Sequence, residues 1–206
     1  MTTTITSVVL QVEDVDAGSA FYTALGLSDR VQLTGGSSPT SGFRGYTLSL
    51  VTAGTAQVDA YVRAATEAGA DLVKEPSKSL WGYGGTFCAP DGAVWTVASS
   101  SKKDRGQAEL SYDDLVLLLG VKDVKEAKRF YAEQGLRVAK GFGGKYVEFE
   151  TAGIKVALQP RHAVAKNAGV SDDGSGSHRL TVIGDAGSFT DPDGFSWEER
   201  SVGAQG

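Results

Sequence analysis

The stretch VEDVDAGSAFYTALGL (residues 12–27) occurs a second time, in altered form, as VKDVKEAKRFYAEQGL (residues 121–136). Both copies begin with Val-x-Asp-Val, carry Phe-Tyr in the middle and end on Gly-Leu. A second related pair follows, because GGTFCAPDGAVWTVASS (residues 84–100) and AGSFTDPDGFSWEERSV (residues 186–202) share Phe, Pro-Asp-Gly and Trp. Two motifs that recur in the same order indicate that the chain consists of two related halves.

A polar segment separates these halves. The stretch SSSKKDRGQ (residues 99–107) carries charge and glycine but no apolar periodicity, which is typical of a linker. We therefore place the boundary near residue 105, which predicts two tandem domains, residues 1–105 and residues 106–206.

The composition argues against several classes of function. The chain has 206 residues, of which 41% are apolar, and this is enough for a sizeable core. Its one cysteine excludes an internal disulfide framework and Cys-based zinc sites, and no basic segment precedes the first strand, so we expect a soluble, cytoplasmic protein. A formal net charge of −5 argues against nucleic acid as a partner. The longest apolar stretch, residues 115–121, is too short to span a membrane.

Apolar periodicity predicts the same opening for both halves. A strand at residues 5–12 precedes a helix at 15–25, and a strand at 112–121 precedes a helix at 123–134. The side chains predicted to face inward are Ala17, Ala20, Phe21, Ala24 and Leu25 in the first helix and Val124, Ala127, Phe130 and Tyr131 in the second.

The halves then differ. The first continues through a Gly/Ser/Pro-rich loop (34–42), a strand (45–51) and a helix (55–68) that turns Val58, Tyr61, Val62 and Ala65 inward. The second continues through strands at 136–142, 145–151 and 154–159, a loose segment and a strand at 178–183, with no helix of three turns between 176 and 190. Each half closes with a Pro-Asp-Gly turn (90–92 and 192–194) and a strand that carries a tryptophan, Trp95 or Trp197.

These motifs resemble those of the vicinal oxygen chelate superfamily, which includes glyoxalase I, extradiol dioxygenases and the bleomycin- and fosfomycin-resistance proteins. The resemblance rests on the V-x-D, FY and LG motifs that open each half, on WGYGG (residues 81–85) and on the F-x-x-PDG-x-x-W endings, which together cover most of the chain. It implies an α+β fold of tandem βαβββ modules, whose curved mixed sheets form a cup for a small ligand.

The resemblance also defines positions for a metal. Metalloenzymes of this superfamily place a His on the opening strand, a second His on a central strand and a Glu four residues after the turn glycine, so that a divalent ion can bind two vicinal oxygens of the substrate. The matching positions are Ser7, Arg44 and Thr96 in the first half and Val116, His178 and Glu198 in the second. Only His178 and Glu198 are usual metal ligands, and each also fits a structural role, so we expect no tightly bound metal and no cofactor.

Eight aromatic side chains are candidates for lining the cup, although a core position is the default for any single one of them. Trp81 and Tyr83 are the strongest candidates, because the glycines around them permit close approach of the backbone to a ligand. The full set is Trp81, Tyr83, Phe87, Trp95, Phe142, Tyr146, Phe189 and Trp197. Cys88, beside Ala89 and Pro90, is expected to be a small buried apolar group rather than a nucleophile.

Three functions remain open at this stage. The first is a metal-free protein that binds a small aromatic or apolar molecule in an aromatic cup. The second is a metal-dependent lyase or dioxygenase that uses His178 and Glu198, and the third is a ligand-free module for assembly or regulation. The sequence also leaves open whether the cup forms within one chain or between the two chains of a homodimer.

Overall fold

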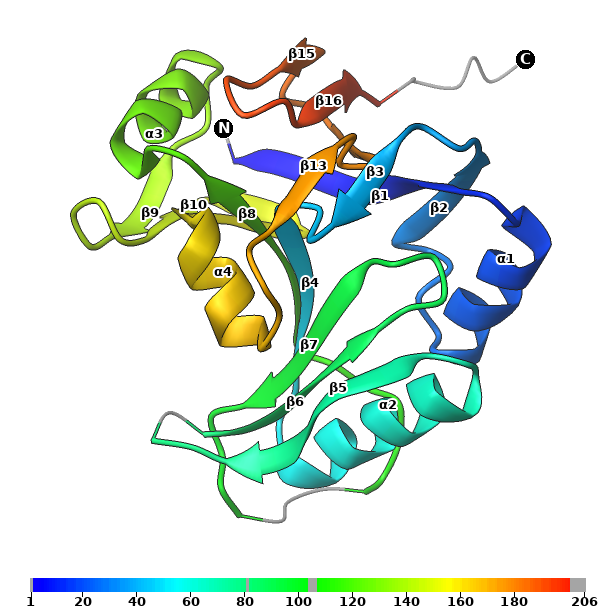
Figure 1. Ribbon diagram of the computed structural model, residues 1–206. Helices are drawn as coiled ribbons and strands as arrows, with labels where there is room; N and C mark the ends of the chain where they lie inside the picture. The colour runs from blue at the N-terminus through cyan, green and yellow to red at the C-terminus, as the bar shows by residue number, and fades with distance from the viewer. Residues whose placement is uncertain (1, 81, 104–106, 201–206) are drawn as a thin grey trace, which may run out of the picture.

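The computed structural model describes residues 2–80, 82–103 and 107–200, and most of its strands lie in two large sheets (Figure 1). The larger sheet has eight strands in the order β5-β6-β7-β4-β8-β12-β10-β9. These strands are β4 (Tyr46–Val51), β5 (Asp71–Lys78), β6 (Tyr83–Cys88), β7 (Val94–Ser99), β8 (Asp114–Val121), β9 (Val138–Gly141), β10 (Val147–Phe149) and β12 (Lys155–Pro160).

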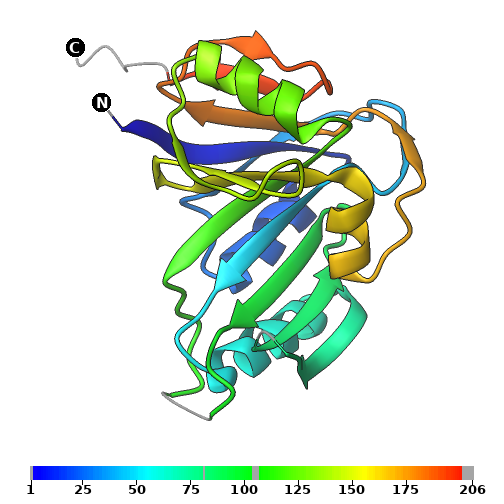
Figure 2. The ribbon, with the colours of Figure 1, turned by 90° about the vertical axis from the view of Figure 1, so that its left-hand side faces the viewer.

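Two complete βαβββ units form this eight-stranded sheet. The first consists of β4, α2 (Thr55–Glu67), β5, β6 and β7, and the second of β8, α3 (Val124–Glu133), β9, β10 and β12. In each unit the opening strand pairs in parallel with the closing strand, β4 with β7 and β8 with β12. The antiparallel pairing of β4 with β8 joins the units, and α2 and α3 lie toward opposite ends of the molecule (Figure 2).

The second sheet is built from two shortened units. One is a βαβ unit of β1 (Thr3–Val12), α1 (Val15–Ala24) and β2 (Val31–Gly35), and the other contains β14 (Leu180–Gly184), β15 (Phe189–Thr190) and β16 (Ser196–Glu199) without a helix. Antiparallel pairing of β1 with β14 joins them, while β11 (Thr151–Gly153) pairs with the start of β1. The short strands β3 (Thr40–Gly42) and β13 (Gly174–Gly176) form a separate ribbon.

Each sheet therefore takes one unit from each half of the chain. The predicted α+β fold of paired βαβββ modules in curved mixed sheets is confirmed, and both sheets are open rather than closed into barrels. Strands of the two halves pair along β4 and β8 and along β1 and β14, so the division into separate domains at residue 105 stays a prediction.

The predicted helices are confirmed as α1, α2 and α3, and residues 176–190 contain no helix. The inner face of α1 differs from the prediction, since Gly18, Phe21, Tyr22 and Leu25 are buried while the three alanines are exposed. Rotating the helix toward Tyr22 buries a large aromatic ring in place of methyl groups, which removes more apolar area from water. Three elements have no counterpart among the predicted ones: β2, β5 and a fourth helix, α4 (Arg161–Ala168).

One face of the eight-stranded sheet contributes to the main core. Phe87, Trp95, Leu48, Leu117 and Val156 form a row of directly paired residues across five strands, and all are fully buried. The row packs with the inner face of α2 and with aromatic rings of α1 in a single core cluster. Because side chains alternate along a strand, the residues between these core positions face the other side of the sheet.

Candidate functional site

The side of the eight-stranded sheet away from α2 carries a polar row. Thr86, Thr96, Ser49, Val116 and Lys155 are directly paired neighbours on five adjacent strands. The hydroxyls of Ser49 and Thr96 lie 2.6 Å apart in a hydrogen bond. Hydroxyl groups in the middle of a sheet face are better suited to contacts with a polar ligand than to apolar packing.

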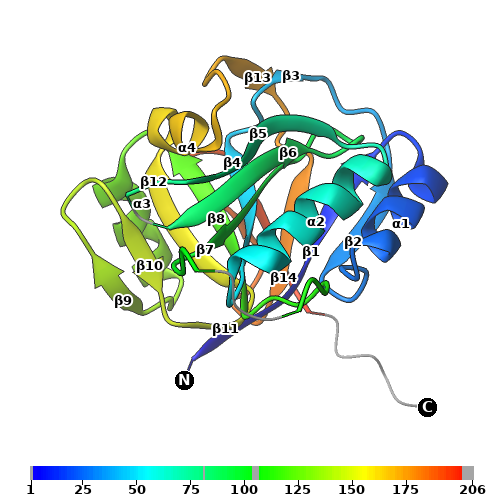
Figure 3. The same ribbon diagram turned by 90° about the horizontal axis from the view of Figure 1, so that it is seen from below.

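Helix α4 covers one end of this polar face and lies on the opposite side of β7 from α2 (Figure 3). It begins directly after β12, and Val164, Ala165 and Ala168 pack with Phe43 and Val94 in a second apolar cluster. Gly120 on β8 permits this close approach, because a Cβ there would lie 3.0 Å from the Cα of Arg161. The helix ends at Gly169, whose φ of 79° is left-handed.

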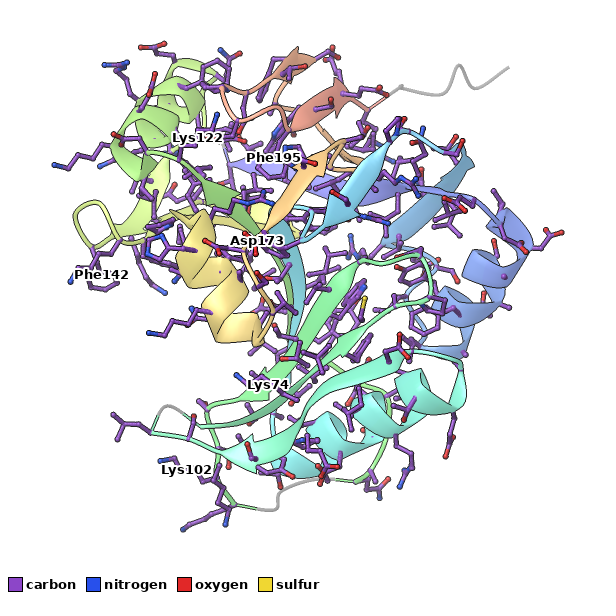
Figure 4. The ribbon with its side chains drawn as sticks, viewed as in Figure 1. Lys74, Lys102, Lys122, Phe142, Asp173 and Phe195 are labelled. Atoms are coloured by element: carbon purple, nitrogen blue, oxygen red, sulfur yellow. The ribbon has the colours of Figure 1, made fainter. Side chains whose placement is uncertain are left out.

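The remaining part of the polar face is an open cavity of about 570 Å³, which we call the trough cavity. It lies between β5, β6 and β7 on one side and the C-terminal end of α4 on the other, where Figure 4 shows Lys74. Its lining combines bare backbone, hydroxyl groups and two lysines. The lining residues are Lys74, Ser77, Ser79, Gly82, Tyr83, Gly84, Gly85, Thr86, Thr96, Val97, Ala98, Ser99, Lys166 and Asn167.

Tyr83 is the one described aromatic candidate that lines the trough cavity. Its hydroxyl donates a hydrogen bond of 2.7 Å to Asp59 of α2, and burial together with Asp59 raises the pKa of the phenol to about 12. The phenol therefore stays protonated at neutral pH and directs its one O–H toward α2, away from the polar face of the sheet. Trp81, the other strong candidate, lies outside the described residues.

The other six aromatic candidates do not come together around this cavity. Phe87, Trp95 and Trp197 are core residues with at most 2% exposure, and Phe189 stacks on Trp197 with ring centroids 5.3 Å apart. Phe142 and Tyr146 lie at the far end of the sheet, where Phe142 is 67% exposed at the turn after β9 (Figure 4). The alternation of strand side chains explains this, because Phe87 and Trp95 face the helices when Thr86 and Thr96 face the cavity.

The strand registers also show which residues occupy the positions matched to a metal site. On the second sheet Ser7 and Glu198 are both in register with Ile183, and on the first sheet Val116 and Thr96 are both in register with Ser49. Arg44 lies before the start of β4, and His178 lies before the start of β14. Neither residue therefore belongs to these rows, and His178 is not in register with Glu198. Within the described residues, no group of three or more His, Cys, Asp or Glu side chains is placed to hold a metal ion.

Comparison with known proteins defines the fold. Neither a protein-family model nor a curated protein matches the sequence. Glyoxalase I from Zea mays, however, is similar in structure, with a TM-score of 0.62 over 95% of this chain and 91% of that protein, at 14% identity. The chain has the glyoxalase fold. A putative dioxygenase from Bacillus subtilis is also similar, with a TM-score of 0.55, 11% identity and coverage of 88% of this chain and 70% of that one.

In this glyoxalase fold His178 makes structural contacts through both ring nitrogens. Nδ1 lies 2.5 Å from the carbonyl oxygen of Arg44, and Nε2 lies 3.0 Å from the carbonyl oxygen of Asp193. The ring also stacks on Phe195 with centroids 3.9 Å apart. A metal would need a free lone pair on one ring nitrogen, and both nitrogens are directed at carbonyl groups instead.

Arg44 occupies the corresponding place before β4, where its guanidinium donates to the carbonyl oxygen of Asp91. Arg44 and His178 are the two residues matched to the central-strand histidine. Each contacts a backbone carbonyl of a Pro-Asp-Gly turn, Arg44 that of Asp91 in the first turn and His178 that of Asp193 in the second. No helix in the described part of the chain has the length and hydropathy required to cross a membrane.

Proposed function

We propose that this protein binds a small organic molecule in the trough cavity without the help of a metal. The observation that carries the proposal is the cavity itself, which lies on the polar face of the eight-stranded sheet and is bounded by α4. A volume of about 570 Å³ lies within the range of small-molecule sites in proteins.

The cavity floor favours a planar ligand. Gly84 has no side chain on the cavity face, so a flat ring can approach the strand backbone closely there. A Cβ on Gly84 would lie 3.3 Å from the Cβ of Ala98, its paired residue on β7, so the glycine keeps the cavity floor flat beside that alanine. Thr86 and Thr96 provide hydroxyl groups beside this floor, and these can orient polar atoms at the edge of a ring.

The charges at the rim favour an acidic group on the ligand. Lys74 and Lys166 both line the cavity, and the Lys74 ammonium donates a hydrogen bond of 3.0 Å to the backbone oxygen of Asn167. This bond holds one positive charge at the mouth beside α4, where it can pair with a carboxylate or phenolate. The proposed ligand is therefore a planar aromatic compound with one acidic substituent.

Ligand-dependent thermal unfolding tests the proposal. A ligand that binds only the folded state raises the free energy of unfolding by RT ln(1 + [L]/Kd), so a panel of aromatic carboxylates and their neutral amides should give a concentration-dependent rise in Tm for the carboxylates. Ala98→Phe places a ring over Gly84 inside the cavity and should abolish the shift. Ala152→Phe is the matched control, because Ala152 is also an exposed strand alanine but lies outside the cavity.

Two results would contradict the proposal. The first is an unchanged rise in Tm in Ala98→Phe, which would place the ligand elsewhere. The second is the absence of a rise in Tm with every aromatic acid, which would favour a module for assembly. Metal analysis of the protein purified without chelator completes the experiment. A stoichiometric divalent ion would instead support the lyase or dioxygenase alternative.

A further inference from the structure

A second cavity, of about 500 Å³, lies beside the first turns of α1 and the first Pro-Asp-Gly turn. We call it the α1 cavity, and it shares no lining residue with the trough cavity. Its charged lining residues come from distant parts of the chain, with Glu13 and Asp14 before α1, Arg44 before β4, Asp91 in the turn and Arg179 before β14. The site therefore exists only in the folded protein.

Arg44 is the unusual group in this cavity. The residue is only 9% exposed, and one of its terminal nitrogens donates to the carbonyl oxygen of Asp91. The guanidinium also interacts with the buried hydroxyl of Tyr46, and Arg44 forms no ion pair among the described residues. Burying a guanidinium without an anionic partner is costly, so Arg44 is suited to an anion supplied by a ligand.

Arg179, by contrast, is already neutralised. Its Nε donates 2.8 Å to the carbonyl oxygen of Ser38, and its two terminal nitrogens lie 3.3 and 3.2 Å from one carboxylate oxygen of Glu13. Arg179 is also the one non-glycine residue in the described chain with a left-handed backbone, at a φ of 51°. Such strain persists where the surrounding structure holds the residue in place, and Glu13 compensates the charge of Arg179 at the edge of the cavity.

The carboxylates of the cavity leave two acceptor oxygens available, one on Asp14 and one on Glu13. Asp91 accepts from the Tyr22 hydroxyl at 2.6 Å and from the backbone amide of Ala93 at 2.7 Å, which engages both of its oxygens. Asp14 caps α1 through Oδ1, which accepts from the Ala17 amide at 2.9 Å, and its other oxygen has no hydrogen bond within the described residues. The cavity thus presents one cation without an ion pair, Arg44, and two carboxylate oxygens without a hydrogen bond among the described residues, of which the one on Asp14 belongs to a group with no cationic partner.

We propose that the α1 cavity binds an amino-acid-sized zwitterion with an apolar side group. The carboxylate of the ligand pairs with Arg44, and its ammonium faces Asp14. Its side group packs against Phe21 and Pro90, which form part of the apolar lining. The carboxylate and the ammonium of such a ligand compensate the charges of Arg44 and Asp14. A ligand that is only an anion would be attracted by Arg44 but repelled by the acidic residues of the cavity.

Calorimetric titration of the full chain with three matched probes tests this proposal. L-phenylalanine carries both charges, phenylpropanoate lacks the ammonium and phenethylamine lacks the carboxylate. We expect saturable binding of one L-phenylalanine per chain, and binding at least about tenfold weaker for each singly charged analogue. Binding of phenylpropanoate as tight as that of L-phenylalanine, or no binding of L-phenylalanine, would overturn the proposal.

Variants of the full chain locate the binding site. Asp14→Asn keeps a good helix cap and removes only the charge, so it should weaken L-phenylalanine binding but not phenylpropanoate binding. Ala17→Phe fills the cavity from the surface of α1 and should abolish binding, whereas Ala20→Phe, an exposed position outside the cavity, should not. Arg44→Gln should also abolish binding, and the two alanine variants decide the question if Arg44→Gln fails to fold. Unchanged affinity in Ala17→Phe would place the ligand elsewhere and overturn the assignment.

Discussion

The hydroxyl of Tyr131 donates a hydrogen bond of 2.7 Å to the carboxylate of Asp191, and both residues are buried. Tyr22, the equivalent residue in the first repeat, makes the corresponding bond of 2.6 Å to Asp91. Asp91 belongs to the first Pro-Asp-Gly turn, whereas Asp191 precedes the proline of the second. The bond between helix and turn thus exists in both halves, although its carboxylate comes from different places in the motif.

Replacing Tyr131 by Phe should destabilise the protein. Burial raises the pKa of this phenol far above its usual value, so the hydroxyl remains a donor, and its loss leaves a buried carboxylate oxygen of Asp191 without this partner. A bond to a buried charged group contributes about 2 kcal/mol, so the free energy of unfolding should fall by about that amount in urea denaturation.

Tyr146→Phe is the control for this substitution. Its hydroxyl also bonds a carboxylate, that of Glu148 at 2.9 Å, but both residues are half-buried, so the loss should stay below about 0.5 kcal/mol. Equal losses in the two variants would show that burial of the bond does not set its contribution.

Gly92 should tolerate alanine less well than Gly135, although their backbones are alike. The φ angles are 88° and 92°, so both substitutions carry a similar backbone strain of about 1 kcal/mol. A Cβ at Gly92 would also lie 2.7 Å from the Arg44 guanidinium, whereas nothing lies within 4 Å of a Cβ at Gly135. We expect Gly92→Ala to lower the free energy of unfolding by at least about 1 kcal/mol more than Gly135→Ala, and identical losses would refute the role of Arg44.

Cys88 should react slowly with iodoacetamide in the folded protein. Burial, with smaller contributions from Asp91 and Asp71, raises the pKa of its thiol, and only the thiolate is nucleophilic. A raised pKa means less thiolate at any pH below it, so the rate at neutral pH should be lower than in urea-unfolded protein and should rise with pH. A folded rate equal to the unfolded rate would contradict this expectation.

His178 should matter for stability and not for metal binding. His178→Ala removes the contacts of both ring nitrogens and the stacking on Phe195, so we expect a loss of about 2 kcal/mol in unfolding free energy. Titration with Zn²⁺, Ni²⁺, Mn²⁺ and Fe²⁺ should give equal affinities for the variant and the parent protein. Submicromolar binding that disappears in His178→Ala would instead support the metal-dependent enzyme.

The candidate sites could be predicted only in part. The Gly-rich residues 82–85 do line a cavity, because glycine leaves open backbone whatever the surrounding fold is. Phe87 and Trp95 are candidate ligand contacts for which core is the default expectation, and only the register of β6 and β7 shows that they face the core. The α1 cavity had no sequence signal, since Arg44 and Arg179 come together only through the pairing of distant strands.

The sequence by itself determined the repeat, the helices α1, α2 and α3 and the closing turns, because apolar periodicity, caps and Pro-Asp-Gly turns are local properties. Only the tertiary structure decided how the halves combine. The pairing of β4 with β8 and of β1 with β14 mixes the halves in both sheets, and it depends on which strand edges meet. It also decided that α4 covers part of the polar sheet face, because the missing Cβ at Gly120 matters only once the helix lies on β8.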